Sequence, residues 1–153
     1  MVVINSMNFN HDVTINNEKN KDKLLLVFTG TNAKFNKINN FYGNIIVENK
    51  NAEIEVRGSN VNGIFMTNSE KKVNFVEYGS SQMQLIAPYA HVEMGSYRIT
   101  VSLIAKSFQL NNSGGSLTYA DIKTSGFPGI SGGATSTPTL EDLIKQSGPI
   151  LEQ

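Results

Sequence analysis

The chain has 153 residues, 13 basic and 13 acidic side chains, and no cysteine. This length is typical of one domain that can bury its own core. The lack of cysteine excludes a disulfide framework and a thiolate metal site. The formal charge of +0 argues against a nucleic-acid binder, because such proteins normally carry a basic excess.

Asparagine is over-represented, with 19 copies that almost all precede residue 112. Two explanations fit this bias. Asparagine tolerates left-handed backbone and hydrogen-bonds to its own backbone, so it suits tight turns. Its codons are also AT-rich, so an AT-rich genome would produce the same excess.

The first 23 residues are polar, with one short strand expected at Val13–Ile15. The following run Leu24–Phe28 is continuously apolar, which indicates a strand buried on both faces. It is far too short to span a bilayer. The start Met1–Asn5 lacks the pattern of a secretion signal. We therefore expect a protein that is made in soluble form or exported within a larger assembly.

From residue 33 onward, apolar centres recur at intervals of about 8–11 residues, the spacing of short strands joined by turns. The clearest alternation is at 53–57, where Ile54 and Val56 are expected to point inward and the charged residues outward. Sharp corners are predicted at the Gly-Ser pairs 58–59, 79–80 and 95–96, and a break at 87–90. The centres of the pattern are Phe35, Ile46, Ile54, Ile64, Phe75, Leu85, Val92, Val101, Phe108 and Leu117.

Two all-β architectures fit this pattern. A β-sandwich needs hairpins, and Asn62–Gly63 is the one Asn-Gly pair that would suit a two-residue hairpin loop. A parallel β-helix instead stacks coils with apolar residues inside and Asn or Gly at the corners. The sequence favours a short parallel β-helix (β-solenoid) over residues 1–124, followed by an extended arm over 125–153.

A motif series over about residues 64–119 adds a family resemblance. It consists of Ala87-Pro88-Tyr89-Ala90-His91-Val92, then Ala105-Lys106-Ser107-Phe108-Gln109-Leu110-Asn111, then Gly114-Gly115 and Tyr119. This series resembles the β-helical repeats of bacterial surface proteins called choice-of-anchor A domains, and similar repeats in pilus-associated proteins. The resemblance implies a coiled β fold and a role in adhesion.

The arm has two parts. Residues 124–137 are rich in Gly, Ser and Thr, which is linker composition. A short helix is then predicted from Pro138 to Gly148–Pro149, with acidic residues in its first turn. Because such a helix is barely two turns long, it must dock on another surface. The apolar residues predicted to bind that partner are Leu140, Leu143, Ile144, Ile150 and Leu151.

Candidate chemistry is sparse. The pairs His11–Asp12 and His91–Glu93 could join a metal or catalytic site, and His91 and Glu93 share one side of a strand. Glu53 and Glu55 flank Ile54 in plain alternation, which favours a solvated face over a pair of glycosidase acids. No nucleophile elbow or phosphate loop is present. The sequence therefore predicts no catalytic residue, no metal and no cofactor.

Aromatic residues offer one further binding surface. Outward-facing tyrosines could form a carbohydrate platform, although tyrosine also often covers the apolar edge of a coil. The four candidates are Tyr42, Tyr78, Tyr89 and Tyr97.

Three functions follow from these patterns. The favoured one is a non-enzymatic structural protein, an accessory, decoration or connector subunit of a bacteriophage virion that binds copies of itself or other virion proteins through its arm. The second is an adhesion module at a bacterial surface that binds glycan or protein. The third and weakest is a polysaccharide-degrading β-helix enzyme that uses Glu93.

Overall fold

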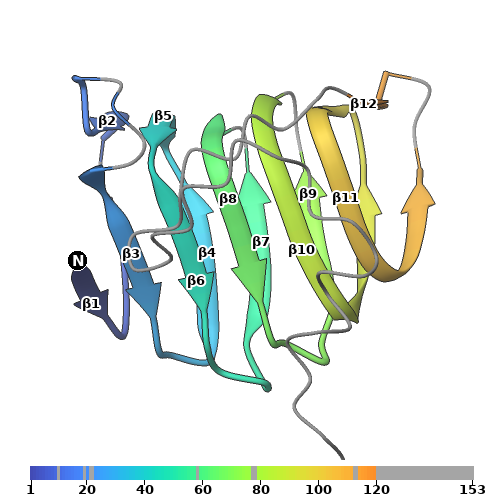
Figure 1. Ribbon diagram of the computed structural model, residues 1–153, viewed down its shortest axis with the longest axis horizontal. Helices are drawn as coiled ribbons and strands as arrows, with labels where there is room; N and C mark the ends of the chain where they lie inside the picture. The colour runs from blue at the N-terminus through green and yellow to red at the C-terminus, as the bar shows by residue number, and fades with distance from the viewer. Residues whose placement is uncertain are drawn as a thin grey trace, which may run out of the picture.

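The computed structural model describes residues 1–9, 11–18, 20, 23–57, 59–76, 79–111 and 114–119. It is an all-β solenoid of about five turns in which the paired strands run parallel (Figure 1). The predicted β-helix is confirmed, and the β-sandwich alternative is wrong because neighbouring strands are parallel and successive coils stack. The strands are β1 (Val2–Ile4), β2 (Val13–Ile15), β3 (Leu25–Phe28), β4 (Asn32–Asn36), β5 (Ile38–Tyr42), β6 (Asn44–Val47), β7 (Glu53–Arg57), β8 (Val61–Thr67), β9 (Val73–Val76), β10 (Gly79–Met94), β11 (Tyr97–Leu110) and β12 (Ser116–Tyr119).

The strands stack into two long sheets and one short one. The front sheet of Figure 1 follows the order β1-β3-β6-β8-β10-β11-β12. The back sheet contains β4, β7, β9 and the ends of β10 and β11. The short sheet joins β2, β5 and the start of β8. Equivalent positions in the middle coils are 20 residues apart, as at Asn44 and Ile64. The register therefore places one residue of each coil above its counterpart in the next.

The core fills the space between the sheets with stacked apolar side chains. In the front sheet one inward column runs Leu26, Ile45, Phe65 and Leu85, all buried. Aromatic rings bridge to the back sheet, with Phe35 and Phe65 edge-to-face at a centroid distance of 5.5 Å. Alternation within each strand thus sends every second side chain into one continuous core.

Asparagine and serine side chains link the coils at the corners. The amide nitrogen of Asn60 donates to the carbonyl of Asn39 at 2.8 Å, and its oxygen accepts from the amide of Ser80 at 2.8 Å. Asn44 accepts from the backbone of Ile64 in the next coil at 3.0 Å. These bonds satisfy backbone groups of the neighbouring coils. They give the abundant asparagine a structural use, whatever the base composition of the gene.

Glycine is required at one bend. Gly63 has φ of +143°, and a Cβ there would overlap the carbonyl oxygen of Gly43 in the preceding coil. The bend lies inside β8, where the strand passes from pairing with β5 to pairing with β6 and β10. Asn62–Gly63 therefore bends a strand and forms no hairpin.

Two breaks that were predicted between strands are absent, because both positions lie inside β10. β10 runs through Ala87–Ala90, where only its register with β11 shifts, and Gly79–Ser80 lies within the same strand. The prediction failed because Pro88 is tolerated at a bulge, where its missing N–H is not needed for the ladder. Gly95–Ser96 does form a bend, between β10 and β11.

The remaining predictions on the arm lie outside the described residues. This applies to everything from residue 120 on, including the predicted helix and its five partner-binding residues. The predicted corner residue Gly58, within the solenoid, also lies outside the described residues. Within the described ranges, none of the chain forms a helix with the length and apolar character needed to cross a membrane.

Candidate functional site

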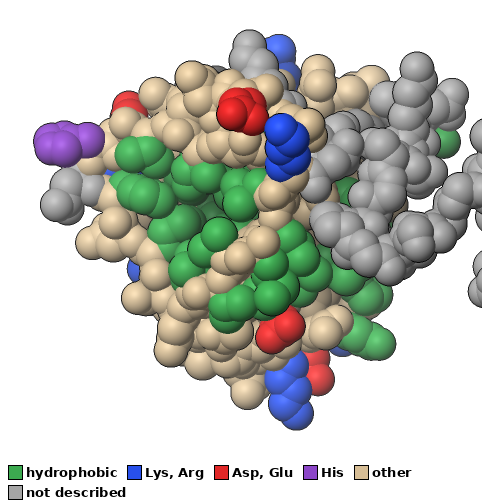
Figure 2. Space-filling view, turned by 60° about the vertical axis from the view of Figure 1, so that its left-hand side comes forward, with side chains coloured by type: hydrophobic (Ala, Val, Ile, Leu, Met, Phe, Trp, Pro, Cys, Tyr) green, Lys and Arg blue, Asp and Glu red, His purple; other side chains and the backbone are tan. Residues whose placement is uncertain are grey.

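The N-terminal end of the solenoid carries an apolar groove. Among the described residues, no further coil lies above the inner side chains of the first coil, and β1 is the last strand at this end of the sheet. Met7 and Phe9 lie partly buried against the core and form one wall. The groove has a volume of about 380 Å³. Figure 2 shows apolar side chains gathered over this end, with acidic and basic side chains around them.

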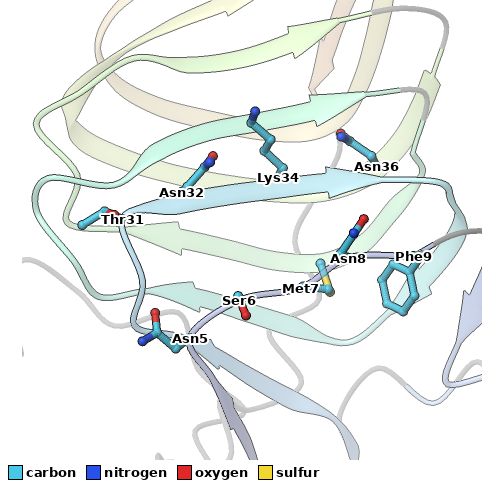
Figure 3. Close-up of a pocket in the computed structure, with 9 residues that line it drawn as sticks. All are labelled: Asn5, Ser6, Met7, Asn8, Phe9, Thr31, Asn32, Lys34 and Asn36. Carbon is cyan, nitrogen blue, oxygen red and sulfur yellow. The ribbon is translucent and has the colours of Figure 1, made fainter.

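A second hollow of about 380 Å³ lies beside this groove. One wall is the segment Asn5–Phe9 and the other is β4, whose Asn32, Lys34 and Asn36 side chains are seen in Figure 3. Its lining is rich in amides, with Lys34 as a single cation among the lining residues that the structure describes. Such a lining suits hydrogen bonds to a polar ligand or peptide better than proton transfer.

The outer face of the back sheet carries polar and charged side chains in register. One column runs Lys34, Glu55, Asn74, Glu93 and Gln109 across five strands. The sequence correctly predicted that Glu53, Glu55 and Arg57 face outward around the buried Ile54 and Val56.

At the C-terminal part of this face four side chains form a chain of polar contacts. The Nδ1 atom of His91 lies 2.7 Å from Oγ of Ser107, and Nε2 lies 3.5 Å from a carboxylate oxygen of Glu93. Lys72 contacts the other oxygen of Glu93 at 3.1 Å. The sequence prediction that His91 and Glu93 share a face is therefore confirmed, whereas Ser107 and Lys72 were missed.

The register of β10 and β11 explains this cluster. Ala87 pairs with Ala105, but His91 pairs with Ser107, because β10 holds two more residues than β11 between these pairs. A bulge of this kind re-aims the side chains that follow it. The extra residues displace Tyr89 outward, where 58% of it is exposed, and set His91 opposite Ser107.

The cluster has the serine–histidine–carboxylate order of a hydrolase, but its surroundings differ. Glu93 divides its charge between His91 and Lys72, and the histidine and lysine side chains are 37% and 50% exposed. A nucleophilic serine needs a base held in place away from water and donors for the oxyanion. Water competes for each of these exposed bonds, so the arrangement favours a hydrated hydrogen-bond network.

Tyr97 corrects one sequence prediction. It was expected to face outward, yet it is fully buried with its ring 5.0 Å from that of Phe75. Its hydroxyl donates to the carbonyl of Ser59 and lies 2.6 Å from Oγ of Ser81. Burial raises the pKa of Tyr97 to about 12, and the bond to Ser81 offsets part of that rise.

The other predicted site residues are scattered. Tyr42 is half-buried, and His11 and Asp12 are exposed near the N-terminal end, far along the chain from His91. Tyr78 and the residues Leu140 to Leu151 lie outside the described part of the chain. The proposed tyrosine platform is thus reduced to Tyr89 and the partly covered Tyr42. In the ranges that the structure describes, no group of three His, Cys, Asp or Glu residues is placed to hold a metal ion.

Comparisons with protein-family models, with curated proteins and with solved structures gave no match. The class of this protein is therefore defined by its own geometry, a parallel β-solenoid with an apolar N-terminal end and a polar outer face on the back sheet.

Proposed function

We propose that this protein is a non-enzymatic structural subunit of a larger assembly. The finer form of the proposal is an accessory, decoration or connector subunit of a bacteriophage virion, assembled in the host cytoplasm. In this proposal the solenoid is the rigid body, and the arm anchors it to copies of itself or to other virion proteins.

The observation that carries the proposal is the open apolar end. Val2 is 47% exposed on an edge strand, and the groove beside it is walled by Met7 and Phe9. Unpaired strand edges and contiguous apolar surface are the features by which β-proteins associate. A solenoid normally needs a polar capping element at such an end, so another chain that covers it would stabilise the fold.

The polar interactions on the outer face and in the core support a structural role over an enzymatic one. The best-aligned polar cluster, around His91, is solvated and shares its carboxylate with Lys72. Inside the core, the buried hydroxyl of Tyr97 ties three coils together through Ser59 and Ser81. Both are hydrogen-bond arrangements that hold coils in register.

Native mass spectrometry of the full chain tests this proposal. The arm variants Leu143→Asp and Ile144→Asp should lower the fraction of assembled protein, because a buried carboxylate without a partner is costly. Equal assembly of both variants and the parent would contradict anchoring through the arm. Hydrolysis of an ester or polysaccharide that disappears in Ser107→Ala and Glu93→Gln would contradict the non-enzymatic part.

A second candidate is an adhesion module at a bacterial cell surface, the role implied by the resemblance to choice-of-anchor A repeats. It is favoured by Tyr89, which stands exposed at the bulge beside His91 and Glu93. An aromatic ring next to polar side chains is a common sugar-binding arrangement. Glycan-array binding that is lost in Tyr89→Ala would support it, and binding unchanged in that variant would count against it.

A further inference from the structure

The outer face of the front sheet carries an unbroken apolar column, which we name the apolar stripe. Strand pairing stacks one outward residue of each of six strands on the next, from β1 to β11. The stripe consists of Val3, Val27, Ile46, Met66, Ile86 and Ile104.

The stripe belongs to the outside of the solenoid. Five members lie between two inward residues of their strands, as Ile86 does between the buried Leu85 and Ala87, and Val3 lies between Val2 and Ile4 at the N-terminal end. The end members Val3 and Ile104 are 57% and 51% exposed. Val27 is 6% exposed yet does not belong to the core cluster that contains its neighbours Leu26 and Phe28. The middle members Ile46, Met66 and Ile86 are half-buried. The column lies outside the core cluster, so packing of the core does not explain its apolar character.

The back sheet gives the internal comparison. Its corresponding outward column carries Lys34, Glu55, Asn74, Glu93 and Gln109. Both faces are built from the same coils, so an outward position in this fold accepts polar residues. Six apolar residues in one column, with Leu25 and Ile64 half-buried beside them, mark a surface suited to an apolar partner.

We propose that the apolar stripe of one copy binds the C-terminal segment 140–151 of a second copy. This inference rests on the proposed function, in which the arm anchors the protein to a neighbour, and it names that neighbour and its binding surface. The segment supplies Leu140, Leu143 and Ile144 at helical spacing on one side, followed by Ile150 and Leu151.

The lengths of the two surfaces match. Six neighbouring strands span five gaps of about 4.8 Å, so the stripe is roughly 24 Å long. A helix over residues 140–147 would be about 12 Å long, at 1.5 Å per residue. Four extended residues, 148–151, add about 13 Å. The segment can therefore cover the stripe from one end to the other.

The position of the stripe favours a second copy as the source of this segment. The stripe begins at Val3, on the same strand whose Val2 and Ile4 line the apolar groove of the N-terminal end. A second copy seated on that end covers the groove and brings its arm alongside the stripe. One partner copy in this position accounts for both apolar surfaces.

Cysteine cross-linking tests the contact, because the chain contains no cysteine of its own. Full-length Ile86→Cys is mixed with full-length Leu143→Cys under oxidising conditions, and the linked peptides are identified by mass. We expect a disulfide between the two variants, and a yield at least about tenfold lower when Asn74→Cys, on the polar back sheet, replaces Ile86→Cys. Equal yields would overturn the inference. So would a doubly substituted Ile86→Cys, Leu143→Cys chain that closes only within one molecule.

A second measurement separates the inference from the proposal on which it rests. Sedimentation velocity of the parent chain and of Ile86→Asp should show self-association that is at least about tenfold weaker in the variant, with Asn74→Asp unchanged as the control. If the parent assembles and Ile86→Asp assembles equally well, the stripe is not the contact, although the structural role stands. If the parent is a monomer at every concentration, the inference of a second copy fails, and the proposed function is left with other virion proteins as the partners of the arm.

Discussion

The two outer faces of this solenoid differ in chemistry although the same coils build both. The back sheet places charged and amide side chains outward in register, with pairs such as Lys72–Glu93 across neighbouring strands. The front sheet places Val27, Ile46 and Met66 at positions of the same kind. Parallel strands are usually apolar on both faces where both faces are covered. The difference therefore indicates that the outer face of the back sheet is the solvated one.

Inner and outer positions of one strand give the largest expected difference. Phe65 is fully buried and packs edge-to-face on Phe35, while its neighbour Met66 faces outward. Phe65→Ala should lower the free energy of unfolding by about 3–5 kcal/mol because it leaves a cavity. Met66→Ala should cost less than about 1 kcal/mol in the isolated chain. Urea unfolding measures both, and equal losses would mean that the two faces are not distinct.

Alkaline pH should expose the contribution of Tyr97. Its pKa of about 12 in the folded chain lies above the ordinary value of 10.0, so burial disfavours the phenolate. Stability is therefore intact below pH 10 and falls as pH rises toward 12, by about 1.4 kcal/mol for each unit.

The matched control for this pH effect is Tyr97→Phe. It should lose about 1–3 kcal/mol at neutral pH, because Ser59 and Ser81 lose a hydrogen-bond partner. Its stability should also fall less steeply above pH 10 than that of the parent. Parallel pH profiles of parent and variant, measured by urea unfolding, would show that Tyr97 does not titrate with folding.

The smallest effect is expected on the polar face. Glu93→Gln removes the contacts with Lys72 and His91, which are partly exposed. Water screens such pairs, so the loss in unfolding free energy should stay below about 1 kcal/mol, and self-association should not change. A loss as large as that of Phe65→Ala would mean that the back face is structurally as important as the core.

Much of the fold could be predicted from the sequence because inward positions are apolar at a regular interval. The alternation at 53–57 predicted the correct inner face, and the run Leu24–Phe28 was correctly predicted as a buried strand. Because the run Leu24–Phe28 is apolar on both faces, it also indicated an apolar outer position, which Val27 occupies in the stripe. It could not be joined to Ile46, Met66 and Ile86 before the strand register was known, since the coil length varies along the chain.

The candidate site was less predictable for the same reason. His91 and Glu93 are two residues apart on one strand, so their common face could be predicted. Ser107 and Lys72 reach them from neighbouring coils through a register shift that no local pattern shows. The prediction that Tyr97 faces outward was wrong. Tyr97 shares one side of its strand with the apolar Ile99, and the charged Arg98 lies on the other side, so this alternation indicated an inward position.

The central claim is that the apolar groove and the apolar stripe are contacts between copies of this chain. Sedimentation equilibrium of the unmodified protein over a wide range of concentration tests it most directly. We predict a mass that is a multiple of the 16.8 kDa chain. A mass of one chain at every concentration would contradict contacts between copies of this chain.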